Sequence, residues 1–285
     1  MKIQISQGIA RIKFITNRLN QFSTRSFCAQ LERVGRLPVI LDLRSVQFAE
    51  PFGLIFLHSF IHRLVSLGAE SVTVITEGSF GNYLARMDFA KGFGGDPRMG
   101  FMPDLAHPSI RAQDLRHRLL EFRTFETAND DETEAITERI AGVIFEQRPD
   151  LRRLHEPIRL ALSEIIDNTQ VHSGAPGGFL LAQTIAGRVY LALGDLGVGI
   201  PHRIRGPFPD LSDSECIGKA LEEGVSTRIG RGGMGLYELS GSVRAIHGAR
   251  MAVRSGSGQV NVYPGRETPH DGCDVIRGTL VEVVF

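Results

Sequence analysis

Apolar residues in the first third of the chain recur in two patterns, one typical of strands and one typical of helices. The runs at 9–15, 38–43 and 72–75 predict strands. Between the last two, residues 52–67 place leucine and isoleucine at helical spacing, and Gly68 follows as a helix C-terminal residue. A strand, a helix and a strand in this order predict a βαβ unit whose sheet is partly parallel.

The pattern changes at residues 91–108, where glycine and proline interrupt every period and predict a connection between domains. The capping box that begins at Ser212 predicts a helix that ends at Gly224. The other predicted elements are helices at 21–34, 131–147, 155–172 and 236–247, and strands at 119–125, 179–184, 188–193, 249–255 and 280–285.

Composition narrows the class of protein. Lys+Arg and Asp+Glu both number 32, so bulk charge does not indicate a nucleic-acid binder. The chain is 42% hydrophobic and 22% charged, as in soluble globular proteins, and its three cysteines lack metal-ligand spacing, which is typical of a reducing compartment. His58, His62 and Arg63 interrupt the longest apolar stretch, so we expect a cytoplasmic protein that does not contact the membrane.

Three polar residues share one face of the helix predicted at 155–172. Glu164, Asn168 and His172 stand at positions i, i+4 and i+8. One interpretation is the solvated edge of an amphipathic helix. The other is chemical: a carboxamide oxygen is a suitable Mg²⁺ ligand, and a carboxylate one turn away can orient or deprotonate a nucleophile.

A glycine-rich loop with one acid follows the strand predicted at 188–193. Its sequence is GDLGVG (194–199). It is either a loop of turn residues in which Asp195 is a cap, or a backbone that lets a flat ligand approach. In the second case Asp195 would accept a hydrogen bond from the exocyclic amine of adenine, where guanine presents a carbonyl.

A second glycine cluster, GRGGMGL (230–236), precedes the last predicted helix. It matches the dinucleotide pattern G-x-G-x-x-G, but no strand precedes it, so its context does not fit that fold. We interpret it as a lid that leads into a helix N-terminus facing phosphates, with Arg228 or Arg231 as an added cation. Gly278-Thr279 then stands before the closing strand, where taken alone it indicates a turn.

The order of these four motifs resembles the GHKL, or Bergerat-fold, superfamily of ATPases and kinases, over residues 115–285. The resemblance implies ATP and Mg²⁺ as cofactors, Glu164 as the catalytic or water-positioning carboxylate and Asn168 as the metal ligand. The other matching residues would contact the nucleotide: Asp195 the adenine amine, Thr279 the same carboxylate, Gly197 and Gly199 the base pocket, and His172, Arg228, Gly230, Gly232, Gly233 and Gly235 the phosphates. Arg231 departs from the glycine that kinases often have in the lid.

Within this superfamily, several branches continue into a second, transducer domain beyond this fold. Because the sequence ends at the closing strand, we do not expect this chain to belong to those branches. Histidine kinases carry a phosphoacceptor histidine on a separate helical hairpin. Here His155-Glu156-Pro157 stands at the start of the helix that carries Glu164, so we interpret it as a helix start.

The first 92 residues show a looser resemblance to the STAS domain of anti-sigma-factor antagonists. It rests on the strand at 39–43 and on Gly53-Leu54, which open a helix. Those proteins carry a phosphorylatable serine just before that glycine, whereas this sequence has Glu50-Pro51-Phe52. Glu50 is either a permanent negative charge in place of a phosphate or a structural acid near a helix N-terminus.

We therefore expect an α/β fold: a STAS-like mixed sheet with helices at 1–92, a linker at 93–114 and an ATP-binding α/β sandwich at 115–285. The resemblance implies a signalling protein of the anti-sigma-factor or serine-kinase type, which binds ATP and transfers its γ-phosphate to a protein serine or threonine, or hydrolyses it. The alternatives are a non-catalytic ATP-gated interaction switch and an orphan histidine-kinase-like protein. We expect a protein partner and no nucleic acid, and the sequence leaves open whether a homodimer forms.

Overall fold

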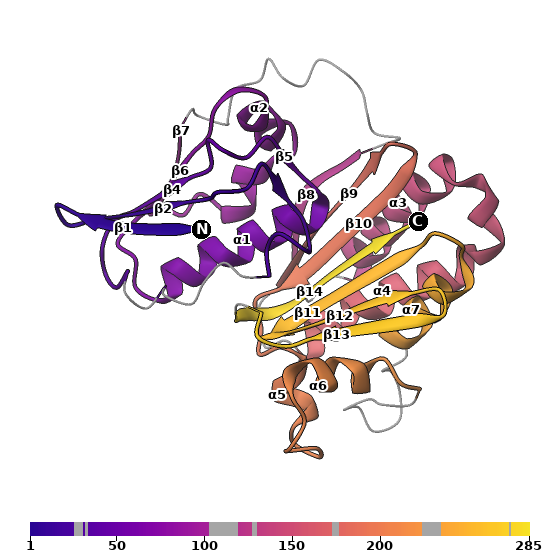
Figure 1. Cartoon of the computed structure of the whole chain (residues 1–285). Helices are drawn as coiled ribbons and strands as arrows, with labels where there is room; N and C mark the ends of the chain where they lie inside the picture. The colour runs from indigo at the N-terminus through magenta and orange to yellow at the C-terminus, as the bar shows by residue number, and fades with distance from the viewer. Residues whose placement is uncertain are drawn as a thin grey trace. The chain divides into compact units, whose positions relative to one another are not determined.

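Two sheets organise the chain (Figure 1). In this computed structural model the described residues are 1–25, 31, 34–102, 119–126, 130–172, 177–223, 235–273 and 275–285. They form two units: unit 1 is Met1–Asp114 with Glu121–Arg123, and unit 2 is Leu115–Leu120 with Thr124–Phe285. The expected α/β fold, a mixed sheet with helices followed by a second sheet with helices, is confirmed.

Unit 1 contains a five-stranded mixed sheet in the order β1-β2-β4-β6-β7. β1 and β2 form an antiparallel hairpin, and β2, β4, β6 and β7 pair in parallel. The strands of unit 1 are β1 (Lys2–Ser6), β2 (Ile9–Lys13), β3 (Arg18–Leu19), β4 (Val39–Asp42), β5 (Phe48–Ala49), β6 (Val72–Ile75) and β7 (Met99–Met102). The short strands β3 and β5 pair separately with each other.

The predicted βαβ unit is confirmed, since helix α1 (Pro51–Ser66) connects the parallel strands β4 and β6. Pro51 occupies the first turn, where its missing N–H costs nothing. Gly68 follows the helix at φ +99°, a conformation that glycine adopts without strain. Helix α2 (Gly78–Arg86) and the 3-10 helix η2 (Phe89–Phe93) come between β6 and β7.

One prediction in this unit is corrected by the structure. Residues 21–25 form turns, because the carboxamide oxygen of Asn20 accepts hydrogen bonds from the N–H groups of Phe22 and Ser23. Half of the predicted helix at 21–34, residues 26–30, 32 and 33, lies outside the described residues. The predicted linker at 93–114 contains β7, the edge strand of the sheet.

Unit 2 contains a seven-stranded sheet in the order β13-β12-β11-β14-β10-β9-β8. The pairs from β13 to β9 are antiparallel. Its strands are β8 (Leu119–Glu126), β9 (Gly177–Ile185), β10 (Arg188–Asp195), β11 (Arg250–Gly256), β12 (Gly258–Tyr263), β13 (Arg266–His270) and β14 (Ile276–Val284). Its helices are α3 (Asp130–Gln147), η4 (Pro149–Leu154), α4 (His155–His172), α5 (Ile200–Ile204), α6 (Asp213–Ala220) and α7 (Gly235–Ala245).

Helices α3, α4 and α7 cover one face of this sheet, behind the strands in Figure 1. Ile158, Leu162 and Ile166 of α4 belong to the core cluster. The sequence predicts Ile158, Leu162 and Ile165 as the buried stripe, and the side chain of Ile165 lies outside the described structure. Strand β10 contributes Leu191 and Leu193 to the same core. Because side chains alternate along a strand, Asp195 lies on this helical face, where β10 ends.

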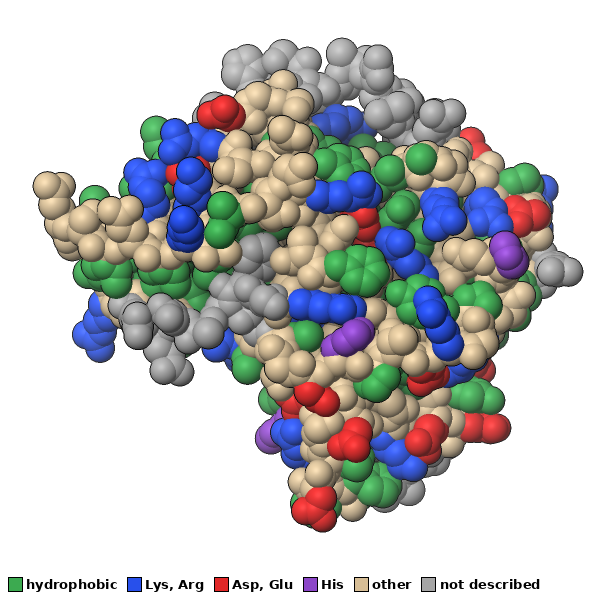
Figure 2. Space-filling model, viewed as in Figure 1, with side chains coloured by type: hydrophobic (Ala, Val, Ile, Leu, Met, Phe, Trp, Pro, Cys, Tyr) green, Lys and Arg blue, Asp and Glu red, His purple; other side chains and the backbone are tan. Residues whose placement is uncertain are grey.

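Helix α6 begins at the predicted capping box. Ser212 Oγ accepts from the Glu215 N–H, and the Glu215 carboxylate accepts from the Ser212 N–H. The helix ends at Ala220, earlier than predicted, and Gly224 lies outside the described residues. Basic and acidic side chains are interspersed around α5 and α6 on the face shown in Figure 2. No helix among the described residues is long and apolar enough to span a membrane.

Candidate functional site

A buried carboxylate marks the end of strand β10. The Asp195 side chain is 7% exposed, and its Oδ1 accepts a hydrogen bond of 2.7 Å from the Gly197 N–H. Burial raises the pKa of Asp195 to about 6, while hydrogen bonds from the backbone N–H groups of Gly197 and Thr279 act in the opposite direction. A carboxylate in this environment can hold a donor such as an amine without competition from bulk water.

Strand pairing brings Thr279 to this carboxylate. β14 pairs with β10, and Leu280 lies opposite Gly194, next to Asp195. β14 also pairs with β11, where Thr279 lies opposite Ser255. The glycine loop after β10 and the Gly278-Thr279 turn, which are about 80 residues apart in sequence, therefore meet at one end of the sheet.

Two glycines let the backbones approach closely here. Gly278 adopts φ +78°, and a Cβ on it would lie 2.1 Å from the carbonyl oxygen of Asp195. Gly199 adopts φ +80°, and its Cβ would lie 2.6 Å from Ser255 Oγ. Larger residues at either position would push the glycine loop and the turn apart.

The helix that carries the predicted catalytic and metal-binding residues lies on the same face of the sheet. Glu164, Asn168 and His172 all fall within α4, one turn apart in succession, and the conformations of their side chains lie outside the described structure. α4 packs against β9 and α7. The structure therefore brings Asp195, Gly197, Gly199 and Thr279 together and places the α4 backbone on the same side of the sheet.

The predicted lid is described only at its end. Gly235 is the first residue of α7, which packs against α4. Arg228, Gly230, Gly232 and Gly233 lie outside the described residues.

Glu50 of unit 1 is buried, and its Oε1 accepts hydrogen bonds from Arg18 Nε at 2.9 Å and Arg18 Nη2 at 2.5 Å. It is the N-terminal flanking residue of α1, but its side chain makes no capping bond to that helix. The pair connects β3 to the start of α1, which is the geometry of a structural acid.

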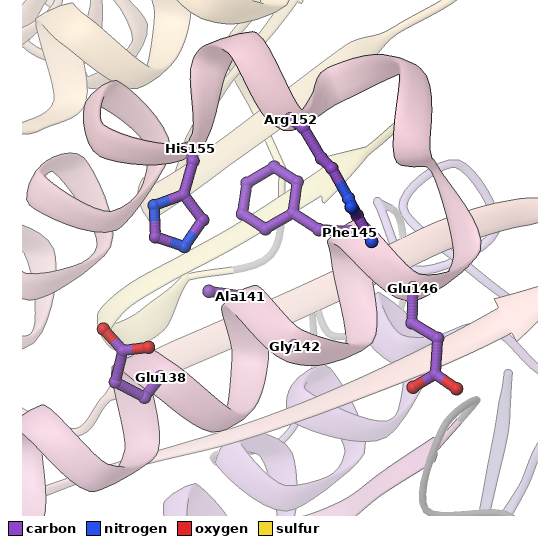
Figure 3. A pocket seen from close by; sticks show the side chains of 7 residues that line it. All are labelled: Glu138, Ala141, Gly142, Phe145, Glu146, Arg152 and His155. Carbon is purple, nitrogen blue, oxygen red and sulfur yellow. The ribbon is translucent and has the colours of Figure 1, made fainter.

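The motif His155-Glu156-Pro157 lies at a separate pocket of about 460 Å³ between α3 and the start of α4 (Figure 3). His155 is the first residue of α4, as the helix-start interpretation requires. Its Nδ1 lies 3.3 Å from Glu156 Oε1, and its ring lies 4.8 Å from that of Phe145.

Sequence reasoning missed Ser255. Its side chain is fully buried and contacts both the loop after β10 and the Gly278-Thr279 turn. A serine near the end of the strand at 250–256 could have indicated a polar contact, but not its partners.

The residues of this site fit an adenine base in two respects. Asp195 is a buried acceptor whose two oxygens offer more lone pairs than two N–H donors use. Gly199 and Gly278 let the loop after β10 and the Gly278-Thr279 turn pack closely, which fixes the backbone around this acceptor. The carboxamide of Asn168 is chemically suited to Mg²⁺. No protein-family model matches this sequence, and no curated protein matches it.

Proposed function

We propose that unit 2 binds ATP with Mg²⁺ and that the chain is a cytoplasmic signalling protein of the anti-sigma-factor or serine-kinase type. The proposal rests on one observation above the others: the backbone donors of two distant motifs, at Gly197 and Thr279, converge on the buried carboxylate of Asp195. The choice of ATP as the ligand comes from the order of the four motifs and their resemblance to the GHKL superfamily.

In this proposal each element of the site has one task. Asp195 accepts a hydrogen bond from the adenine amine, and Gly199 and Gly278 allow the close packing of loop and turn that positions this carboxylate. Asn168 on α4 would hold the magnesium ion, which neutralises phosphate charge when bound. Glu164, one turn earlier, would position or deprotonate the attacking hydroxyl or water.

Unit 1 would recognise the protein partner or hold unit 2 in check. The parallel βαβ arrangement of unit 1 supports a STAS-like unit. The Glu50 carboxylate accepts a hydrogen bond from Arg18. We therefore favour a structural role for Glu50 over that of a phosphate substitute.

A calorimetric titration with ATP and GTP in the presence of Mg²⁺ tests nucleotide binding. We expect ATP to bind and GTP to bind much more weakly, because guanine would place a carbonyl against the Asp195 carboxylate. Asp195→Asn should weaken ATP binding by roughly 1–3 kcal/mol, the cost of a lost charge-assisted hydrogen bond. The exposed Asp210→Asn is the control. Equal affinity of wild type and Asp195→Asn would remove Asp195 from the adenine site.

Turnover is tested separately with ATP labelled at the γ-phosphate. Wild type should release phosphate or label a protein serine or threonine, and Glu164→Ala should not. If both proteins bind ATP and neither turns it over, the chain is an ATP-gated interaction switch. A label that is lost in acid and kept in base would instead indicate a histidine-kinase-like protein.

A further inference from the structure

Ser255 of β11 joins three parts of the chain through one hydroxyl group. It donates a hydrogen bond of 2.8 Å to the carbonyl oxygen of Gly278. It accepts one of 2.9 Å from the N–H of Ile200, directly after the glycine loop. Its Oγ also lies 3.2 Å from Oγ1 of Thr279.

The hydroxyl of Ser255 has one proton, and this fixes the direction of the remaining contact. Since that proton goes to Gly278, the bond between the two hydroxyls requires Thr279 to be the donor. The Thr279 oxygen then has only lone pairs to offer to a ligand. Thr279 would thus act as a second acceptor near Asp195, which suits an amine and not a carbonyl.

Burial makes these hydrogen bonds hard to replace. Ser255 has no exposed surface, so water cannot substitute for its hydroxyl without rearrangement. Loss of the hydroxyl would leave the Ile200 N–H and the Gly278 carbonyl without this partner. Both groups adjoin backbone that positions the Asp195 carboxylate.

We propose that Ser255 is a positioning residue for the adenine-binding site: it holds the glycine loop and the Gly278-Thr279 turn in register, so that the backbone N–H groups of Gly197 and Thr279 reach the Asp195 carboxylate. The adenine part of this inference rests on the proposed function. The geometric part, that Ser255 sets the surroundings of Asp195, does not.

Ser255→Ala tests the proposal, with Ser257→Ala as the matched control. Ser257 Oγ makes a hydrogen bond of similar length, 2.7 Å, but to Asp213 of α6. Ser255→Ala should weaken ATP binding about tenfold or more, and Ser257→Ala should leave it within about twofold.

A second measurement needs no nucleotide. The titration of the Asp195 carboxyl carbon is followed by NMR in the unliganded proteins, together with amide exchange of Gly197 and Thr279. Ser255→Ala should raise the Asp195 pKa above the wild-type value and speed both amides, because the N–H donors withdraw from the carboxylate. A purely structural serine would lower the melting temperature without moving this titration.

The outcomes separate the two proposals. An unchanged Asp195 titration and unchanged amide exchange in Ser255→Ala would overturn the positioning role, whether or not the substitution weakens ATP binding. If wild type binds no ATP but the titration shifts, the proposed function fails and the positioning role stands. Ser255→Cys keeps the branching of the side chain but has a larger atom and a weaker donor, and it replaces Ser255→Ala should that variant not fold.

Discussion

Asp195 is ionised at neutral pH, and burying this charge lowers the stability of the folded chain. Burial raises its pKa from 3.8 to about 6, against the two N–H donors that lower it. A difference of this size corresponds to about 3 kcal/mol between the folded and unfolded chain. A residue kept in such a place is a candidate functional group, because a neutral side chain would stabilise the fold more.

The raised pKa of Asp195 predicts the direction in which the stability of the protein changes with pH. Since the folded pKa is raised, the folded protein binds more protons than the unfolded chain between pH 3.8 and 6, and the Asp195 contribution to stability falls as pH rises through that window. We expect the free energy of unfolding of wild type, relative to Asp195→Asn, to drop by roughly 2.4 kcal/mol from pH 4 to pH 7.5. Urea unfolding of both proteins across this range measures it. A constant difference would show that Asp195 titrates normally.

His58 shows the opposite behaviour in unit 1. It is buried, its Nε2 lies 3.0 Å from the Gly92 carbonyl oxygen, and its ring lies 4.7 Å from Phe93. Burial, with a smaller effect from His62, lowers the pKa of His58 to about 3. The neutral ring therefore contributes stability that is complete above pH 6.5 and is lost progressively as pH falls toward 3.

We expect unit 1 to lose stability on acidification by up to about 1.4 kcal/mol per pH unit from this histidine. His58→Phe keeps a ring of similar shape and should flatten the dependence between pH 6.5 and 4, although it loses the hydrogen bond to Gly92. The exposed His202→Phe is the control. Unfolding curves of the three proteins at several pH values measure this dependence. Equal slopes of the free energy of unfolding against pH would contradict the lowered pKa of His58.

At the scale of elements, the close approach of two turns makes Gly278 more sensitive than its conformation alone explains. Gly278 and Gly265 share nearly the same backbone angle, φ +78° and +77°. A Cβ on Gly265 would meet nothing within 4 Å, whereas one on Gly278 would collide with the backbone of Asp195. Alanine substitutions at these two glycines therefore distinguish the cost of backbone strain, which both share, from the cost of a steric clash, which only Gly278 has.

Gly265→Ala should cost about 1 kcal/mol of stability, the usual cost of positive φ in alanine. Gly278→Ala should cost several times more, because the loop after β10 must move. Thermal unfolding of both variants gives the comparison. Equal losses would mean that the turn and the Asp195 backbone do not pack as closely as described.

The elements that periodicity predicts well are those with one apolar face. α4 runs over residues 155–172 in both sequence and structure, because Ile158 and Leu162 belong to one apolar stripe that packs into the core. β12 and β13 were missed. β12 buries the polar Gln259 and Asn261, which bond to each other, so its alternation is hidden in the sequence.

For the site, residue types predicted the chemistry and only tertiary pairing supplied the geometry. Asp195 and the two glycines after it stand out in the sequence, but the register that sets Ser255 opposite Thr279 depends on how β11, β14 and β10 pair. Strand pairing across such distances is not encoded in any local pattern. Ser255 was missed for this reason.

At the scale of the whole molecule, the division into two units does not follow a single cut in the sequence. Residues Glu121–Arg123 of β8 belong to unit 1, although β8 is also the edge strand of the second sheet. The Phe122 ring lies 4.8 Å from that of His58 and 5.6 Å from that of Phe89. Gly92 leaves room for it, since a Cβ there would lie 2.4 Å from the Phe122 ring.

A fragment that ends at residue 114, just before the predicted second domain, should therefore be incomplete. Fragment 1–126 restores Phe122, and we expect it to be more stable than fragment 1–114 by about 3–5 kcal/mol, the typical cost of removing a buried phenylalanine ring. Phe122→Ala in the longer fragment should erase the gain. Phe125→Ala should not, because Phe125 belongs to the core of unit 2. Urea unfolding of the four proteins provides the measurement. If fragment 1–114 matches 1–126, Phe122 is not part of the core of unit 1, and the single cut predicted from the glycine-rich and proline-rich stretch is the better boundary.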